Sequence, residues 1–246
     1  MSLISKLGRR DGKYGIIRTM RDLSVRENVS AACAAIRANA VPMVLLWLAA
    51  VGTVAAYCLV PPFAAALEPL ARWQTANGWL AAAANRVAFT ALLPGAFLLT
   101  IRELRPKRPL ATIFSYALWG AAWGVLCDGF FSLQQAVFGV GRDFATVAAK
   151  TLVDQFVWTP LFCTPMNVAF FTWVAGGFAP FRIGDAFRRG YGPMLIASWI
   201  VWLPVVATVY LFPLPLQVQL VGFAGAFWML AALAAGGRKG WMEGGE

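Results

Sequence analysis

Residues 41–60 (VPMVLLWLAAVGTVAAYCLV) form a run of 20 residues that contains no charged side chain. A helix of about 20 apolar residues is long enough to cross the hydrocarbon core of a bilayer, where it satisfies its own backbone hydrogen bonds. The whole chain is 60% hydrophobic and only 13% charged, whereas roughly a quarter of the residues of an ordinary soluble domain are charged. This run therefore predicts a membrane-spanning helix.

Further apolar segments lie at residues 79–101, 110–131, 144–171, 193–212 and 214–235. Pro213 and Pro215 separate the last two segments, because proline lacks the N–H that a continuing helix requires. A chain of 246 residues has room for one bundle of about six helices, since each span uses about 20 residues plus a connection. The predicted fold class is an all-α, polytopic helical membrane bundle with about six transmembrane helices in residues 41–235.

The basic residues predict how this bundle is oriented. Cytoplasmic loops of membrane proteins are rich in Lys and Arg, and loops on the other side are depleted in them. Residues 1–40, the second and fourth connections and the tail (236–246) carry 17 basic residues, whereas the remaining connections carry only Arg72 and Arg142. This alternation predicts that both termini lie on the cytoplasmic side.

The N-terminal arm (residues 1–40) is basic and places Ile16, Met20 and Leu23 at helical spacing. This pattern predicts an amphipathic helix on the membrane surface that is attracted by anionic lipid. An organellar transit peptide has a similar pattern, although the acidic residues of the arm oppose that interpretation. A cleaved signal peptide is not expected, because the first apolar run begins near residue 40 and is long enough to span the membrane.

Other functional classes are disfavoured by composition. The net charge of +10 does not indicate nucleic-acid binding, because the basic residues flank apolar segments instead of covering a folded face. The absence of histidine excludes HExxH zinc sites, His-ligated haem and Ser–His dyads. The four cysteines are isolated in the sequence, so neither a CxxC metal site nor a disulfide framework is indicated. We expect no metal, no cofactor and no nucleic-acid partner.

Polar side chains at membrane depth are costly and are usually either functional or paired. Asp128 and Gln135 lie seven residues apart in the third span and therefore nearly on one helical face, away from the neighbouring glutamine at position 134. Lys150 and Asp154 lie four residues apart in the fourth span, close enough for an ion pair. Gln155 follows directly.

Arg86, near the start of the second span, has no local partner. It needs a carboxylate from another helix, or a position close enough to the surface for its guanidinium to reach water. Arg86 and the five polar residues above form the candidate site, and two interpretations are equally favoured. They line a polar path through the bundle, or they form an interhelical clamp that fixes helix register.

Prolines and glycines in the spans add weaker signals. Pro160, Pro165 and Pro204 each leave a backbone carbonyl without its helical N–H donor. Such a carbonyl can bind water or solute in a path, or the proline can simply kink the helix for packing. The packing interpretation is favoured. Gly120 and Gly124 make a GxxxG pair, which predicts close helix packing.

The third and fourth spans contain two motifs, DGFFSLQQAVFG from Asp128 and KTLVDQFVWTP from Lys150. The last hairpin contains three more, SWIVWLP, YLFPLPLQ and AFWMLA. These segments resemble the family of Mpv-seventeen and peroxisomal membrane protein twenty-two, especially its bacterial members, over residues 80–235. The resemblance implies a small integral membrane protein of a bacterial inner, mitochondrial or peroxisomal membrane with proposed pore activity toward small solutes. It also implies that the arm and the first span are an added N-terminal module.

The chain departs from the family pattern in the last hairpin. Leu203 separates Trp202 from Pro204, where the family has adjacent Trp and Pro, and Met229 follows Trp228, where the family has Asn. No precise ligand contact is therefore carried over from the family.

The resulting hypothesis is a pore for small solutes across an inner membrane, with the bacterial cytoplasmic membrane expected and an organellar membrane as the alternative. A homo-oligomer or a larger membrane complex fits equally well as its assembly. One alternative is a non-catalytic accessory subunit packed against a larger complex. The other is an intramembrane enzyme that uses Asp128 and Asp154 as an aspartyl pair, but neither residue stands in a GxGD motif, so we do not expect an enzyme.

Overall fold

The fold was analysed in a computed structural model that describes residues 29, 30, 33, 37, 40–100 and 105–236. Almost all of the basic arm and the tail from residue 237 lie outside these residues, so the predicted surface helix and its lipid contact stay predictions. Side chains from residue 228 onward are also outside the description, including that of Trp228 in the family-like motif.

Helices account for every regular element in the described ranges. They are α4 (Ala40–Leu59), α5 (Pro61–Asn77), α6 (Trp79–Val87), η1 (Ala88–Leu92), α7 (Leu93–Thr100), α8 (Pro109–Phe138), α9 (Phe144–Val153), η3 (Asp154–Cys163), α10 (Thr164–Ala175), α11 (Ile183–Val209) and α12 (Leu214–Gly236). The segments η1 and η3 are π-helical. The all-α prediction is therefore confirmed for the described part of the chain.

Each predicted span coincides with helix, but two of them are composite. The segment 79–101 comprises α6, η1 and α7, and the segment 144–171 comprises α9, η3 and α10. The helix predicted at 193–212 begins ten residues earlier, at Ile183, and continues through Pro193. Pro213 lies in the turn as expected, whereas Pro215 lies in the first turn of α12, where a missing N–H costs nothing.

Three described helical stretches, 79–100, 109–138 and 190–209, are long and apolar enough to cross a membrane. A fourth crossing is possible if 43–59 and 61–77, which meet at an angle of 104°, count as one bent span. Pro61 and Pro62 explain this bend, because neither can donate the N–H that would continue α4. The count supports a multi-pass membrane protein, and it does not by itself establish six crossings.

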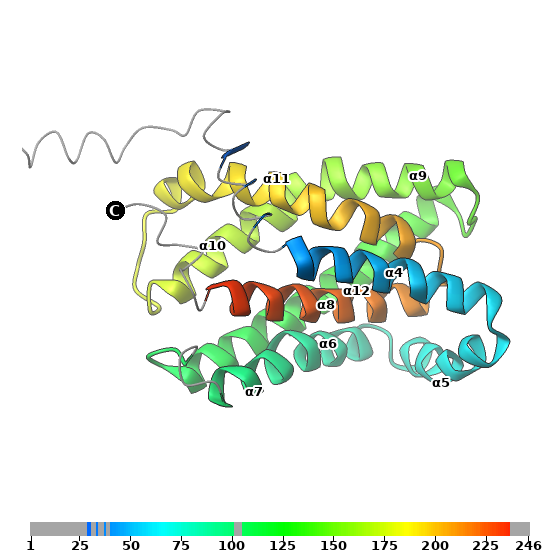
Figure 1. Cartoon of the computed structure of the whole chain (residues 1–246), viewed down its shortest axis with the longest axis horizontal. Coiled ribbons are helices and arrows are strands. Elements are labelled where there is room, and N and C mark those ends of the chain that lie inside the picture. Colours follow the sequence, from blue (N-terminus) through cyan, green and yellow to red (C-terminus); the bar gives the residue numbers. More distant parts are fainter. Residues whose placement is uncertain (1–28, 31–32, 34–36, 38–39, 101–104, 237–246) are drawn as a thin grey trace, which may run out of the picture.

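The helices run back and forth along one axis (Figure 1). In Figure 1, α4, α8 and α11 run in one direction, and α6 with α7, the α9–η3–α10 unit and α12 return in the other. Helix α5 therefore lies at the same end of the bundle as the connections 139–143 and 210–213. The connections 105–108 and 176–182 lie at the opposite end.

The larger core cluster joins α4, α8, α11 and α12 around residues such as Leu46, Phe131, Val201 and Val218. The Trp47 indole adds a hydrogen bond to the Val201 carbonyl at 3.0 Å. Many large apolar side chains instead point outward, with Leu110 76% exposed. Such a surface is unfavourable in water and suits contact with lipid tails.

Helices α6 and α8 pack at close range, as the GxxxG pair predicts. A Cβ atom at Gly124 would clash with the backbone carbonyl of Ala82, and one at Gly120 would clash with the Thr90 hydroxyl. Both glycines are therefore required by packing, and the packing interpretation is confirmed.

Candidate functional site

The predicted polar residues do not form a single site. Lys150, Asp154 and Gln155 lie around the junction of α9 and η3, and Asp128 and Arg86 belong to two other groups of contacts. Gln135 lines a pocket at one end of the bundle.

Asp154 is the centre of the first group and is only 5% exposed. The Tyr210 hydroxyl donates to Oδ2 of Asp154 at 2.9 Å, and the Gln155 amide donates to Oδ1 at 2.8 Å. The Gln134 amide donates to the Tyr210 hydroxyl at 3.2 Å and to the Lys150 carbonyl at 3.0 Å. We call Gln134, Asp154, Gln155 and Tyr210 the Asp154 cluster. It joins α8, η3 and the end of α11.

The predicted ion pair between Lys150 and Asp154 is wrong. Among the described residues, neither Lys150 nor Asp154 takes part in an ion pair, whereas the exposed Arg182 and Asp185 form one. The Lys150 ammonium instead donates to the Gly139 carbonyl at 2.6 Å and lies 5.9 Å from the centre of the Tyr210 ring. The α-helical spacing itself is present, because the Asp154 N–H bonds the Lys150 carbonyl. The side chains have other partners, since the ammonium reaches Gly139 and the carboxylate accepts from Tyr210 and Gln155.

The π-helical segment η3 explains two of the predicted prolines. In π-helical winding, a carbonyl accepts from the N–H five residues later, as Thr159 does from Thr164. Pro160 has no N–H for the Gln155 carbonyl. The Trp199 indole of α11 donates to that carbonyl at 2.6 Å.

The same substitution of donors occurs one turn later. Pro165 cannot donate to the carbonyl of Pro160, and the Tyr191 hydroxyl of α11 donates to it at 2.9 Å. Side chains of a neighbouring helix thus complete the backbone hydrogen bonds that the two prolines leave open. The packing interpretation therefore fits Pro160 and Pro165. Pro204 lies inside α11, which continues as a helix beyond it.

A second polar group links α5 to α6, α8 and α12. The Gln74 amide donates to Asp128 at 3.1 Å, and its carbonyl accepts from Gln219 at 2.6 Å. The Asn85 amide in turn donates to the Gln219 carbonyl. Asp128 is half-buried, and the three amide side chains are buried. The partner of Asp128 is therefore an amide from α5 rather than a charged side chain from another span.

Arg86 meets neither of the conditions set by the sequence. It is 4% exposed, so it does not reach the surface, and no carboxylate among the described residues forms an ion pair with it. Its Nη2 donates to the Cys127 sulfur at 3.4 Å, and its Nε has no partner in the described contacts. The expectation of a carboxylate or a surface position is thus wrong, because a thiol takes the partner's place.

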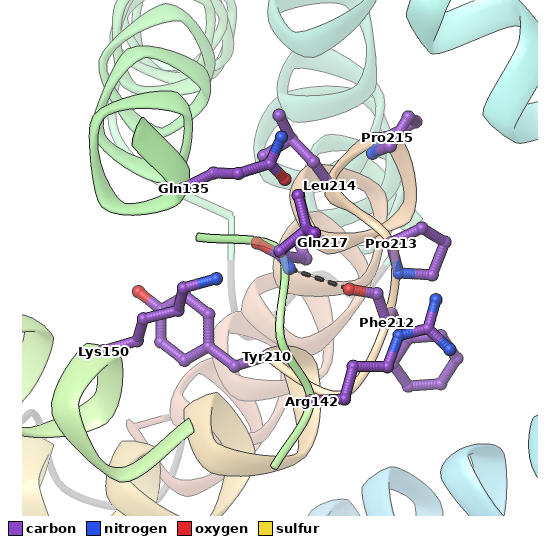
Figure 2. A pocket seen from close by; sticks show the side chains of 10 residues that line it. Gln135, Arg142, Lys150, Tyr210, Phe212, Pro213, Leu214, Pro215 and Gln217 are labelled. Carbon is purple, nitrogen blue, oxygen red and sulfur yellow. Dashed lines mark hydrogen bonds between the residues drawn. The ribbon is translucent and has the colours of Figure 1, made fainter. Parts of the chain in front are cut away.

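A pocket of about 340 Å³ opens at the end of the bundle that carries α5, between α8, α9 and the turn that joins α11 to α12 (Figure 2). We call it the mouth pocket. It is lined by Gln135, Val140, Arg142, Lys150, Tyr210, Phe212, Pro213, Leu214, Pro215 and Gln217. Tyr210 belongs to both the pocket and the Asp154 cluster, so one side chain connects the pocket lining to the buried carboxylate.

Asp143, which follows Arg142, is engaged in capping α9. It accepts from the Thr146 hydroxyl at 2.7 Å and from the Thr146 N–H at 3.1 Å. These hydrogen bonds hold the pKa of the Asp143 carboxyl below its usual value. The carboxylate therefore stays ionised and directed at the helix N-terminus.

Several residues of these groups were not predicted. Gln134 was expected to point elsewhere, yet it is 2% exposed and holds Tyr210. Gln74 and Gln219 were not considered, although Gln219 lies in an apolar segment where a polar side chain signals a partner. Tyr191 and Trp199 carry no sequence signal of their own, because their role follows from prolines on another helix.

The acidic side chains of the two polar groups do not share partners. Within the described ranges, no three His, Cys, Asp or Glu residues are grouped in a way that would hold a metal ion. Asp128 accepts from Gln74, whereas Asp154 accepts from Tyr210 and Gln155. The two carboxylates are therefore held by separate partners.

Comparisons with protein-family models, curated proteins and solved structures each found no match. The family resemblance therefore rests on the residues quoted from the sequence alone.

Proposed function

We propose that this protein is a six-crossing membrane protein of the Mpv-seventeen type that lets small solutes pass through its bundle, and that the Asp154 cluster closes the path in the described conformation. The observation that carries the proposal is the position of Tyr210. Tyr210 lines the mouth pocket, and its hydroxyl donates to the buried carboxylate of Asp154. A polar pocket that lies next to a buried carboxyl group is the arrangement expected of a closed polar path.

The chemistry of the cluster supports a gate. Opening requires the Tyr210 hydroxyl to leave Asp154 and the Gln134 amide to leave Tyr210. Solute or water entering from the mouth pocket would replace both hydrogen bonds, so the exchange has a modest net cost. Asp154 would then face the path and favour cations at that point.

Six crossings are supported by the direction of the helices. The connections 105–108 and 176–182 share one end, and 139–143 and 210–213 share the other (Figure 1). The first end carries the cluster of Arg105, Lys107 and Arg108, and basic loops favour the cytoplasmic side. The mouth pocket would then open on the opposite side of the membrane.

Reconstitution into liposomes tests the proposal. Purified protein should give conductance and release of trapped small solutes, and Asp154→Asn should lower the preference for cations over anions by about threefold or more. Asp185→Asn is the matched control, because Asp185 is an exposed carboxylate paired with Arg182 at the other end. It should leave selectivity unchanged.

A structural clamp is the second candidate, and a specific observation favours it. Both carboxylate oxygens of Asp154 accept hydrogen bonds, and their donors and the Gln134 amide join three helical elements. The clamp would be preferred if liposomes showed no flux at any voltage and Asp154→Asn changed only thermal stability. In that outcome the pore proposal is abandoned.

A further inference from the structure

The mouth pocket contains a buried ammonium group that no carboxylate of the described residues neutralises. Lys150 is 3% exposed, and its one hydrogen bond is to the carbonyl of Gly139. In the described part of the chain, no Asp or Glu oxygen lies within 4.0 Å of its nitrogen. An ammonium has three N–H donors, so two remain available beside the pocket.

Such a charge is unfavourable without a counter-ion. Moving an ammonium out of water costs several kcal/mol in real proteins, and a carbonyl dipole offsets only part of that cost. A bound anion in the adjoining pocket would offset the rest. The surroundings of Lys150 are therefore those of an anion site.

A second cation and several neutral donors line the same pocket. Arg142 is an exposed lining residue on the connection between α8 and α9, and its neighbour Asp143 is occupied by Thr146. Gln135 adds a side-chain amide, and Gln217 adds one whose nitrogen already donates one hydrogen bond to the Phe212 carbonyl at 2.8 Å. Figure 2 shows Lys150, Arg142, Gln135 and Gln217 on different sides of the pocket. These groups offer more donors than the two oxygens of a carboxylate require, and they suit a phosphate group with three or four oxygens.

Apolar residues complete the lining. Phe212 and Pro213 come from the turn between α11 and α12, Leu214 and Pro215 come from the first turn of α12, and Val140 comes from the connection after α8. A volume of about 340 Å³ lies at the lower end of the range for small-ligand sites. The pocket thus has room for a phosphate group and a short carbon skeleton.

We propose that the mouth pocket binds a phosphate monoester through Lys150 and Arg142, which names an anion as a regulatory ligand at this end of the bundle. The inference depends on the proposed function at one point, because it treats this pocket as the entrance of the solute path. The phosphate has two possible sources, a water-soluble ester or the headgroup of an anionic lipid, because the pocket lies at the end of the bundle where headgroups are found.

The test is a binding titration of the full chain in a non-ionic detergent. One arm uses glycerol 3-phosphate, with glycerol as its phosphate-free control. The other arm uses short-chain phosphatidic acid, with the matching short-chain diacylglycerol as its control. Saturable binding in either arm, with a rise in the unfolding midpoint as ligand is added, supports the site and identifies its source.

Variants assign the binding to this pocket. Lys150→Met keeps the length of the side chain and removes its charge, and it should weaken binding about tenfold or more, as should Arg142→Gln to a smaller extent. Arg72→Gln is the matched control, since Arg72 is an exposed cation on α5 at the same end and does not line the pocket. If Lys150→Met does not fold, Lys150→Arg should keep binding and Arg142→Gln decides the test.

The inference is overturned if the wild type binds neither phosphate ligand more tightly than its control, or if Arg72→Gln weakens binding as much as Arg142→Gln. Flux and binding are measured separately. Binding without flux in liposomes rejects the proposed pore and keeps the anion site, and flux without binding rejects the anion site alone.

Discussion

Glutamine side chains make many of the polar contacts inside this bundle. Gln74, Gln134 and Gln219 each bond at least one group on another helix, and all three are buried. An amide carries both a donor and an acceptor, so it can join two partners without bringing a charge into the membrane. Neutral amide contacts thus hold polar residues of the described helices together without an ion pair at these positions.

Tyr210→Phe tests the Asp154 cluster at the level of one atom. The substitution removes the hydroxyl that donates to Asp154 and accepts from Gln134, and it keeps the ring that packs against Phe131. Hydrogen bonds between membrane helices contribute about 0.6 to 2 kcal/mol each, so we expect stability to fall by about 1–3 kcal/mol in detergent unfolding.

Tyr57→Phe is the control for that measurement. Its ring contacts Phe212 at a centroid distance of 4.8 Å, so the variant reports on ring packing without touching the Asp154 cluster. Equal stability losses in the two variants would show that the Tyr210 hydroxyl makes no special contribution.

The sequence predicted which charged side chains lie inside the bundle more reliably than it predicted their partners. Asp154, Lys150 and Arg86 were selected because charges at membrane depth are costly, and all three are buried with specific contacts. Their partners include a tyrosine, a loop carbonyl and a cysteine, which come from distant parts of the chain. Periodicity along one helix contains no information about such neighbours.

At the scale of the element, η3 is the least regular part of the bundle and depends on α11. Trp199 and Tyr191 lie eight residues apart on one helix and reach carbonyls five residues apart on the other. Helical spacing places both side chains on the same face of α11. The winding of η3 and the position of α11 are therefore linked.

A double-mutant cycle measures this link. Trp199→Phe leaves the Gln155 carbonyl without its indole donor and should cost about 1–2 kcal/mol of stability. Pro160→Ala restores a backbone N–H that can reach the same carbonyl. The stability loss caused by Trp199→Phe should therefore be less than about half as large in the Pro160→Ala background as in the wild type. This difference is the coupling energy between the two positions.

Additive effects of the two substitutions would contradict the assigned hydrogen bond. Trp173→Phe serves as the control, because Trp173 is 39% exposed and lies in α10. It should show the same small cost in both backgrounds.

The contact between α6 and α8 gives a second prediction at this scale. Gly124→Ala would place a methyl group against the Ala82 carbonyl and should cost about 1–3 kcal/mol through overpacking. Gly129→Ala lies on the same helix with nothing within 4 Å of the added carbon, and it should be neutral or slightly stabilising. Unfolding of both variants in the same detergent compares them directly, and equal effects would argue against close packing at Gly124.

For the whole molecule, the apolar segments predicted the helices well because length and hydropathy are local properties. The interior breaks were not predicted, since the π-helical segments and the early start of α11 at Ile183 depend on contacts between helices. The sequence also gave no indication that α5 supplies Gln74 to the interior, because this segment was not assigned to a span.

The number of crossings is tested by labelling single cysteines in a variant whose four native cysteines are replaced. Lys107→Cys and Arg182→Cys should react with an impermeant reagent from the same side, and Arg142→Cys should react from the opposite side. Six crossings require this pattern, because the α9–η3–α10 unit must then span the membrane between positions 142 and 182.

Reaction of positions 142 and 182 from one side would reduce the number of crossings and overturn the six-crossing proposal. Reagent added after permeabilisation is the control, since it shows that an unreactive cysteine was protected by the membrane rather than by burial.

The hydrogen bonds of α4 and α5 also set the order in which the protein can assemble. Trp47 bonds Val201 across a separation of 154 residues, and Gln74 bonds Gln219 across 145. Helices enter the membrane in the order in which they are synthesised, so the first two must wait for the last two before these contacts form. A ribosome that stalls before α12 would therefore leave Gln74 without its Gln219 partner, and such a nascent chain would be a natural target for membrane quality control.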